Sequence, residues 1–182
     1  MLTIHTADLV NPGGESPSLP GGAVLVEGRR IAAVETYEDL VAAHPTARVR
    51  RWPGVLTPGL LHPHGRELLE ESYHPDPRED LGDEPLTGEA LSALAMTDAR
   101  WGASARRGVQ RLLAQGTAAV VGPLQRPTVI DAVHRSGLRI QDGSAEAAPP
   151  PLLPGADATF AIFSGTECVA TVIRGRLLHR RR

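Results

Sequence analysis

The chain has 182 residues, 41% of them hydrophobic and 22% charged, with a formal net charge of −2. This composition predicts a globular protein with one substantial core, and it excludes disordered and collagen-like classes. The near-neutral charge and an aromatic content of 3% argue against nucleic-acid binding. No apolar run approaches the length of a membrane span, and the N-terminus lacks a signal-peptide pattern, so we expect a cytoplasmic protein without a membrane partner.

The first sixty residues alternate apolar and polar side chains, as an antiparallel β unit does. Thr36 is the predicted cap of a short helix. Residues 11–22 are rich in Pro, Gly and Ser and are predicted to form a loop. The predicted strands are residues 2–6, 23–26, 30–34, 47–52 and 55–61.

Residues 67–89 contain nine carboxylates, and the prolines among them forbid a long helix. We interpret this segment as a charged loop, with an acidic docking surface or a cation site as the alternatives. Alternating helices and strands follow it, which is typical of parallel βα units. The predicted elements are a helix capped by Thr87, a helix over 104–115, a strand over 117–121, a helix over 128–136 and a strand over 138–140. A proline-rich extended linker over 145–154 and a closing hairpin over 159–163 and 169–178 complete the chain.

Four parts of the chain match a known family pattern: residues 22–26 with 30–34, residues 56–60, residues 107–121, and residues 154–163 with 172–176. On these stretches the chain resembles the amidohydrolase superfamily, most closely its imidazolonepropionase and aminodeoxyfutalosine deaminase type. The resemblance implies a composite β-sandwich built from both chain ends, with a catalytic barrel inserted between them. A closed (β/α)8 barrel takes about 200 to 250 residues. We therefore predict a mixed α/β fold, with the sandwich formed by residues 1–54 and 155–182 and a truncated, partial TIM-barrel-like βα region at 55–154.

The motif TPGLLHPH at residues 57–64 resembles the strand that carries metal ligands in that family. Aligned without a gap, it puts His62 at the family's acidic position, His64 at the first metal histidine and Arg66 at the second. A two-residue deletion instead makes His62 and His64 the ligand pair, and side chains at i and i+2 of a strand share one face. Both registers stay open, and His62 and His64 are the predicted metal ligands.

Zinc catalysis requires three protein ligands and an open coordination position. Side chains that could complete such a set are His74, Asp76, His134 and Asp142, although none shows ligand spacing. All 19 residues counted as Lys or Arg are Arg, so a Schiff-base lysine and a carbamylated metal-bridging lysine are excluded. The single Cys168 excludes an internal disulfide, and we expect it to be a small apolar filler rather than a nucleophile.

Three functional hypotheses follow from these residues. The one we favour is a truncated amidohydrolase relative without hydrolytic activity and without a cofactor, which acts structurally or binds a partner. Its exposed strand edge would be covered by a second copy or by a related enzyme. The alternatives are a hydrolase of non-peptide carbon–nitrogen bonds with zinc or another divalent metal at His62 and His64, and a small-molecule binding module. The sequence assigns no catalytic and no cofactor-binding residue.

Overall fold

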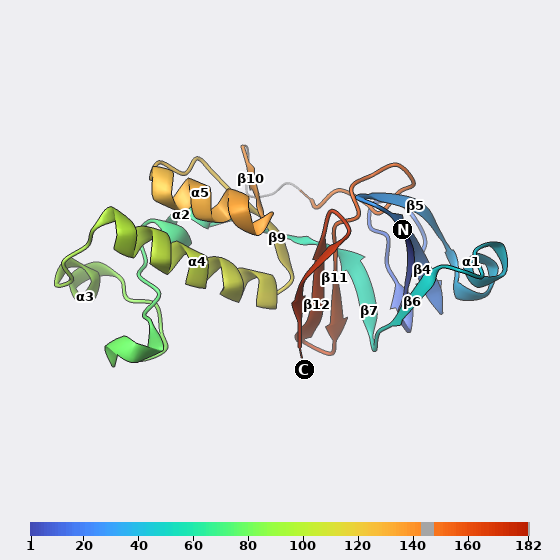
Figure 1. Ribbon diagram of the computed structural model, residues 1–182, viewed down its shortest axis with the longest axis horizontal. Helices are drawn as coiled ribbons and strands as arrows, with labels where there is room; N and C mark the ends of the chain where they lie inside the picture. The colour runs from blue at the N-terminus through green and yellow to red at the C-terminus, as the bar shows by residue number, and fades with distance from the viewer. Residues whose placement is uncertain (143–147, 182) are drawn as a thin grey trace. The chain divides into compact units, whose positions relative to one another are not determined.

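The computed structural model describes residues 1–142 and 148–181 (Figure 1). The chain divides into two compact units. The first unit consists of Met1–Leu60, Ala114–Ala118 and Ala148–Arg182, and the second consists of Leu61–Leu113 and Ala119–Ala147.

Two sheets form the first unit, and each follows from the period-two alternation of its strands. The four-stranded sheet has the order β5-β4-β1-β6, and the six-stranded sheet has the order β13-β12-β11-β7-β2-β3. The antiparallel pairing of β7 with β11 joins the N-terminal part of the chain to its C-terminal part. The strands are β1 Leu2–Thr6, β2 Leu9–Val10, β3 Leu19–Pro20, β4 Gly22–Glu27, β5 Arg30–Thr36, β6 Arg48–Arg51, β7 Val55–Pro58, β11 Phe160–Ser164, β12 Glu167–Ile173 and β13 Arg176–Arg180.

Side chains from both sheets share one apolar core, which makes the first unit a β-sandwich. Val24 and Ile31 come from the four-stranded sheet, and Leu56, Phe160 and Val172 come from the six-stranded sheet. The composite sandwich predicted from the two chain ends is therefore present in the described residues. Burial of these side chains is the main favourable contribution to its stability.

The other face of the four-stranded sheet is covered by helix α1 (Tyr37–Ala43). Leu40 of this helix packs against Ile4 and Leu25 in a second apolar cluster. The predicted cap is confirmed, because the side-chain oxygen of Thr36 accepts a hydrogen bond from the backbone N–H of Asp39 (3.2 Å). This cap satisfies one of the N–H groups that the first helical turn leaves without a partner.

The strand predicted over residues 55–61 is divided at Gly59. Its first half, β7, lies in the sandwich, whereas β8 (Leu60–His62) lies in a separate three-stranded sheet. A Cβ atom at Gly59 would lie 2.5 Å from the Cβ of Ala118, so only glycine fits at this division. The boundary predicted after residue 54 therefore differs from the observed unit, which extends to Leu60.

The C-terminal boundary also differs from the predicted one at residue 155. Residues 145–147 of the predicted linker lie outside the described part of the chain. Leu152, however, is 1% exposed and belongs to the sandwich core, and its backbone N–H donates to the carbonyl of Pro12 (2.8 Å). An apolar side chain that fills the core gives this segment a packing role beyond that of a linker.

The second unit contains the three-stranded sheet of order β10-β9-β8, in which β9 (Thr117–Val121) and β10 (Arg139–Gln141) are parallel. Helices α4 (Asp98–Ala114) and α5 (Pro127–Ser136) run beside each other in Figure 1. They pack against each other at Gly102, where a Cβ would lie 3.4 Å from the Cβ of Thr128, in ordinary van der Waals contact. The shorter helices are α2 Gly65–Leu69, the 3₁₀ helix η1 Pro77–Glu79 and α3 Gly88–Ser92.

Helix α4 begins six residues before the predicted start at residue 104. Trp101 lies in the added turns and is buried, so the apolar face of the helix is longer than the sequence pattern indicated. Gly137 ends α5 in the left-handed conformation, as predicted.

No helix in the described ranges is long and apolar enough to cross a membrane. The cytoplasmic location stays a prediction.

We expect Gly54→Ala to destabilise the sandwich more than Gly28→Ala. Both glycines have a positive φ, +82° and +59°, which costs an alanine about 1 to 2 kcal/mol. A Cβ at Gly54 would also lie 2.0 Å from the carbonyl oxygen of Phe163, whereas nothing lies within 4 Å of one at Gly28. This overlap should lower the free energy of unfolding by a further ~2 kcal/mol in urea titrations. Equal losses in the two variants would contradict the close approach.

Candidate functional site

The two predicted metal ligands lie near each other in the second unit. His62 ends β8 and His64 directly precedes α2, and their ring centroids are 6.2 Å apart. His64 is exposed, with its Nδ1 3.7 Å from Oε1 of Glu67. Burial and the neighbouring His64 lower the pKa of His62 from its usual 6.5, against a smaller opposing effect of Glu67. The imidazole of His62 is therefore neutral at pH 7.

A hydrogen bond between the two residues restricts metal binding. The backbone N–H of His64 donates to Nδ1 of His62 (3.2 Å). Because Nδ1 accepts this bond, the proton of neutral His62 resides on Nε2. A metal ion could bind Nε2 only after the tautomer changes, and it could bind Nδ1 only by replacing the hydrogen bond.

The remaining ligand candidates do not complete the site. In residues 1–142 and 148–181, no group of three His, Cys, Asp or Glu side chains is placed to hold a metal ion. His74 is buried and bonded to the carbonyl of Leu68 (2.9 Å), and Asp76 caps η1. His134 is exposed on α5, and Asp142 directly follows β10. Metal binding by His62 and His64 stays a prediction.

Arg66, which one register placed at a ligand position, is engaged in an ion pair. Its Nε lies 3.0 Å from Oε1 of Glu71, and both side chains are about half exposed. A guanidinium carries no free lone pair for a metal and stays charged. In the ungapped register, the strand would therefore retain one histidine ligand.

Three arginines of α4 bind residues 67–89, which we call the acidic segment. We call these arginines the arginine clamp: Arg100, Arg107 and Arg111. They are seven and four residues apart, so they lie on one face of the helix. Arg100 pairs with Glu79 (2.9 Å), and Arg111 donates to the backbone carbonyl of Asp83. The sequence analysis missed this cluster, although the spacing of the three arginines was a usable signal.

Tyr73 and Glu79 form the centre of this contact. The hydroxyl of buried Tyr73 donates to Oε2 of Glu79 (2.6 Å), and the backbone N–H of Asp76 donates to the same oxygen (3.0 Å). The guanidinium of Arg100 lies 4.9 Å from the centroid of the tyrosine ring. These donors, Tyr73 foremost, lower the pKa of Glu79 from 4.5 to about 2. Glu79 is thus held in its ionised form by donors of its own unit.

His74 connects the same segment to the interior of α4. Its backbone N–H donates to Oγ of Ser104 (2.8 Å), and Arg107 donates to its carbonyl (2.8 Å). A Cβ at Gly108 would lie 2.6 Å from Nε2 of His74, so the helix needs glycine there. Burial lowers the pKa of His74, which keeps the ring neutral, and its buried Nδ1 has no hydrogen-bond partner among the described residues. These contacts define a packing residue rather than a metal ligand.

The buried carboxylate of Glu70 links α2 to the start of α5. Its Oε1 accepts hydrogen bonds from the backbone N–H groups of Gln125 (2.7 Å) and Arg126 (2.5 Å). A carboxylate at this position accepts hydrogen bonds from N–H groups next to the N-terminus of α5. Its negative charge also interacts favourably with the positive end of the helix dipole. Another acidic residue of the segment therefore has a structural role.

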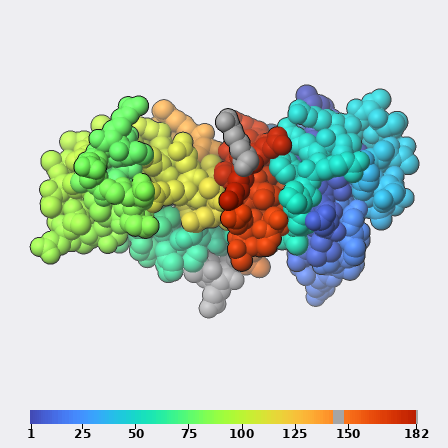
Figure 2. Space-filling view, turned by 90° about the horizontal axis from the view of Figure 1, so that it is seen from below, coloured from blue at the N-terminus to red at the C-terminus, as the bar shows by residue number. Residues whose placement is uncertain are grey.

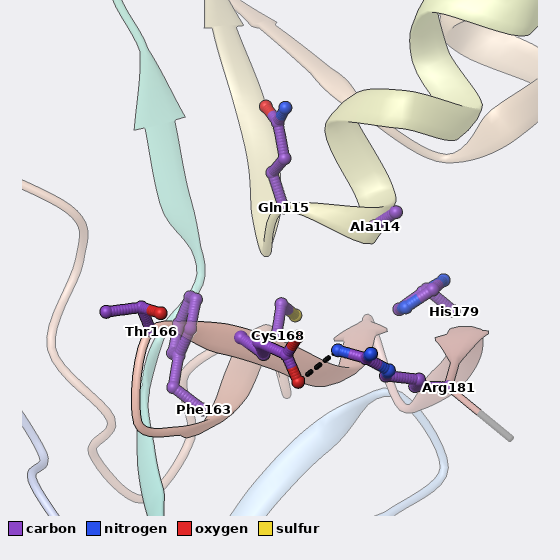
Figure 3. A pocket seen from close by; sticks show the side chains of 8 residues that line it. Ala114, Gln115, Phe163, Thr166, Cys168, His179 and Arg181 are labelled. Carbon is purple, nitrogen blue, oxygen red and sulfur yellow. Dashed lines mark ion pairs between the residues drawn. The ribbon is translucent and has the colours of Figure 1, made fainter.

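A hollow of about 360 Å³ opens in the first unit beside the turn between β11 and β12 (Figure 3). Two residues that line the hollow, Arg181 and Glu167, form an ion pair across it. The side chain of Gln115, also in the lining, points away from Cys168. The sulfur of Cys168 contacts the carbonyl of Ala170 and the hydroxyl of Thr171, each at 3.4 Å. Burial raises the pKa of this thiol, so it stays protonated and unreactive at pH 7.

Comparisons with known proteins agree with this architecture. A family model described as the imidazolonepropionase-like composite domain of bacteria matches residues 22–47. These residues form β4, β5, α1 and the turn after it. No curated protein matched the sequence.

Solved structures with a similar fold are amidohydrolase-type enzymes. Ochratoxinase from A. niger is 24% identical with a TM-score of 0.52, and the match covers 81% of this chain and 32% of that one. A zinc-bound adenosine deaminase from Xanthomonas campestris is 17% identical with a TM-score of 0.52, at 81% and 36% coverage. A triazine hydrolase from Arthrobacter aurescens is 17% identical with a TM-score of 0.51, at 78% and 35% coverage.

The chain thus spans about a third of the length of these structures. Similarity at this level of identity establishes the fold, while activity has to be argued from the site. The predicted resemblance to the amidohydrolase superfamily, and within it to the imidazolonepropionase-like composite domain, is confirmed.

We expect Glu79→Gln to destabilise the protein at pH 7 and to have little effect near pH 2. The carboxylate has a lower pKa in the folded protein, so its contribution is fully present above about pH 4.5 and is lost as the pH falls toward 2. Urea titrations across this range should show the difference between parent and variant shrinking with acidity. Glu84→Gln, an exposed acid of the same segment, is the control and should have little effect at any pH. A difference between parent and Glu79→Gln that does not vary with pH would contradict the ionised Glu79 contact.

Proposed function

We propose that this chain is a non-hydrolytic relative of the imidazolonepropionase-like amidohydrolases that acts structurally or by binding a partner. It combines their composite β-sandwich with a truncated barrel. The observation that carries the proposal is that no group of three ligand side chains is placed to hold a metal ion among the described residues, and that two of the candidate ligands are engaged elsewhere. His74 is bonded to Leu68, and Asp76 caps η1.

The available ligands do not fit the metal requirement of this enzyme class. A catalytic zinc takes three protein ligands and keeps one position open for water. His62 and His64 supply two at most, and the bond between them holds His62 in a tautomer unsuited to binding through Nε2. We therefore derive no metal-dependent step for this chain.

The second unit supports the partner-binding part of the proposal. In the described part of the chain its sheet has three strands, with β10 and β8 at the two edges, whereas a closed barrel has eight. A strand at an edge presents backbone N–H and C=O groups that can pair with another chain. A second copy of this chain, or a related full-length enzyme, would satisfy these groups by adding a strand.

The test begins with zinc content. We expect elemental analysis after zinc supplementation and mild chelation to find less than stoichiometric zinc in the parent and the same low content in a His62→Ala, His64→Ala variant. His134→Ala is the control for loss of an exposed histidine elsewhere. One equivalent of zinc in the parent and in His134→Ala, absent from the double variant and accompanied by hydrolysis of cyclic amides or aminopurine nucleosides, would instead establish a hydrolase.

Partner binding is tested on the same samples. We expect light scattering coupled to size-exclusion chromatography to give a mass that rises with concentration toward a dimer. Hydrogen exchange should then show protection of Arg139–Gln141 that increases with the same concentration series. A strict monomer whose β10 amides exchange freely at every concentration would argue against self-association through this edge.

A further inference from the structure

A surface feature of a different kind lies in the first unit. It is a groove of about 280 Å³ between β6 and β13, and we call it the arginine groove. In Figure 2 the C-terminal residues, in red, lie beside the segment that includes β6, in cyan. The residues that line it include Arg48, Arg50, Arg51, Trp52, Leu177 and Arg180.

Strand register directs two of these arginines toward each other. Strands β6 and β13 are edge strands of different sheets. Arg50 is the register partner of His5, which is buried and packs edge-on against Phe160 at 4.9 Å. Arg180 is the register partner of Ala170, a core residue. Register partners share a face, so Arg50 and Arg180 both lie on the inner faces of their sheets, at the open side of the sandwich.

Alternation along β6 gives Arg48 the same face as Arg50. Arg51 lies on the opposite face, where its guanidinium stacks over Tyr37 of α1 at 4.4 Å. The groove therefore gathers three inward-facing guanidiniums, from Arg48, Arg50 and Arg180, within one hollow.

These three charges have no acidic partner among the described residues. Throughout the described part of the chain, no Asp or Glu forms an ion pair with Arg48, Arg50 or Arg180; the ion pairs of this unit use Arg30, Arg174 and Arg181 instead. Burial, then Arg48 and Arg180, lower the pKa of Arg50. Like charges held together at the surface repel one another, so an anion in the groove would be stabilised.

The floor of the groove is aromatic and rigid. The indole N–H of Trp52 donates to Nδ1 of His5 (3.2 Å), and the guanidinium carbon of Arg180 lies 5.7 Å from the centroid of the Trp52 ring. Burial, with added effects of Arg50 and Arg48, lowers the pKa of His5 to about 3. His5 is therefore a neutral acceptor at pH 7, and its bond holds the indole in place without adding charge.

We propose that the arginine groove binds the diphosphate group of a small molecule, through Arg48, Arg50 and Arg180. Guanidinium forks match phosphate oxygens and hold them in bidentate hydrogen bonds. A single carboxylate would offset one of the three charges, whereas each phosphate group brings about 1.5 to 2 negative charges at pH 7. This site lies wholly in the first unit, so it is independent of the function proposed above.

A simpler role for these arginines is protection of edge strands against pairing with other chains. Arg176 allows the two explanations to be separated. It is an exposed arginine of the same edge strand β13, but it is not among the residues lining the groove. Edge protection treats Arg176 and Arg180 alike, whereas a diphosphate site distinguishes them.

The experiment is isothermal titration calorimetry of the full chain with pyrophosphate and with phosphate at constant ionic strength. We expect saturable one-to-one binding, tighter for pyrophosphate than for phosphate. Arg50→Gln and Arg180→Gln should each weaken pyrophosphate binding at least about tenfold, because each removes a charge-assisted hydrogen bond. Arg176→Gln, with the same change of charge, should alter it less than about threefold.

The indole N–H resonance of Trp52, assigned with a Trp101→Phe variant, provides a local readout. It should shift on addition of pyrophosphate in the parent and in Arg176→Gln. Comparison with adenosine diphosphate distinguishes a free diphosphate from one carried by a larger molecule, and binding of either supports the site. Absence of saturable binding to both, or equal weakening by Arg176→Gln and Arg180→Gln in folded variants, would overturn the proposal in favour of edge protection.

Discussion

The antiparallel pairing of β7 with β11 is the interaction on which the first unit depends. It joins strands about a hundred residues apart, with Leu56 opposite Ile162 and Pro58 opposite Phe160. Bringing such distant segments together carries a loop-closure cost, which the shared apolar core offsets. This pairing also incorporates the C-terminal hairpins into the sheet, and it thereby provides the edge strand β13 that lines the arginine groove opposite β6.

Electrostatic pairing has the corresponding role in the second unit. The acidic segment is too rich in proline and charge to fold by apolar burial alone, and it is held against α4 by the arginine clamp and by Tyr73. A carboxylate that accepts these bonds is stabilised in its ionised form and is satisfied by them. The same side chains therefore cannot also serve as free metal ligands, which connects the packing of this segment with the incomplete set around His62 and His64.

The comparisons place the fold among amidohydrolase-type structures, over about a third of their length. In such enzymes the chemistry depends on the number and arrangement of ligands, and a shared scaffold is not sufficient for it. Here the scaffold is clear, with a sandwich composed of both chain ends and one parallel βα unit, β9–α5–β10. The chemically distinctive surface of the first unit is a groove in which Arg48, Arg50 and Arg180 have no acidic partner among the described residues, in a chain that contains no lysine.

The sequence by itself determined the features that arise from neighbouring residues. Period-two alternation predicted β1 and β4, the Thr36 cap predicted the start of α1, and Gly137 predicted the end of α5. The spacing of His62 and His64 was also visible as a candidate ligand pair. Only the tertiary structure decided the break at Gly59, the tautomer of His62, the arginine clamp and the meeting of Arg50 with Arg180. The physical reason is that backbone propensity and periodicity act over a few residues. The contacts that the sequence did not predict depend instead on the three-dimensional path of a loop, or on close approach between segments that are distant in the chain.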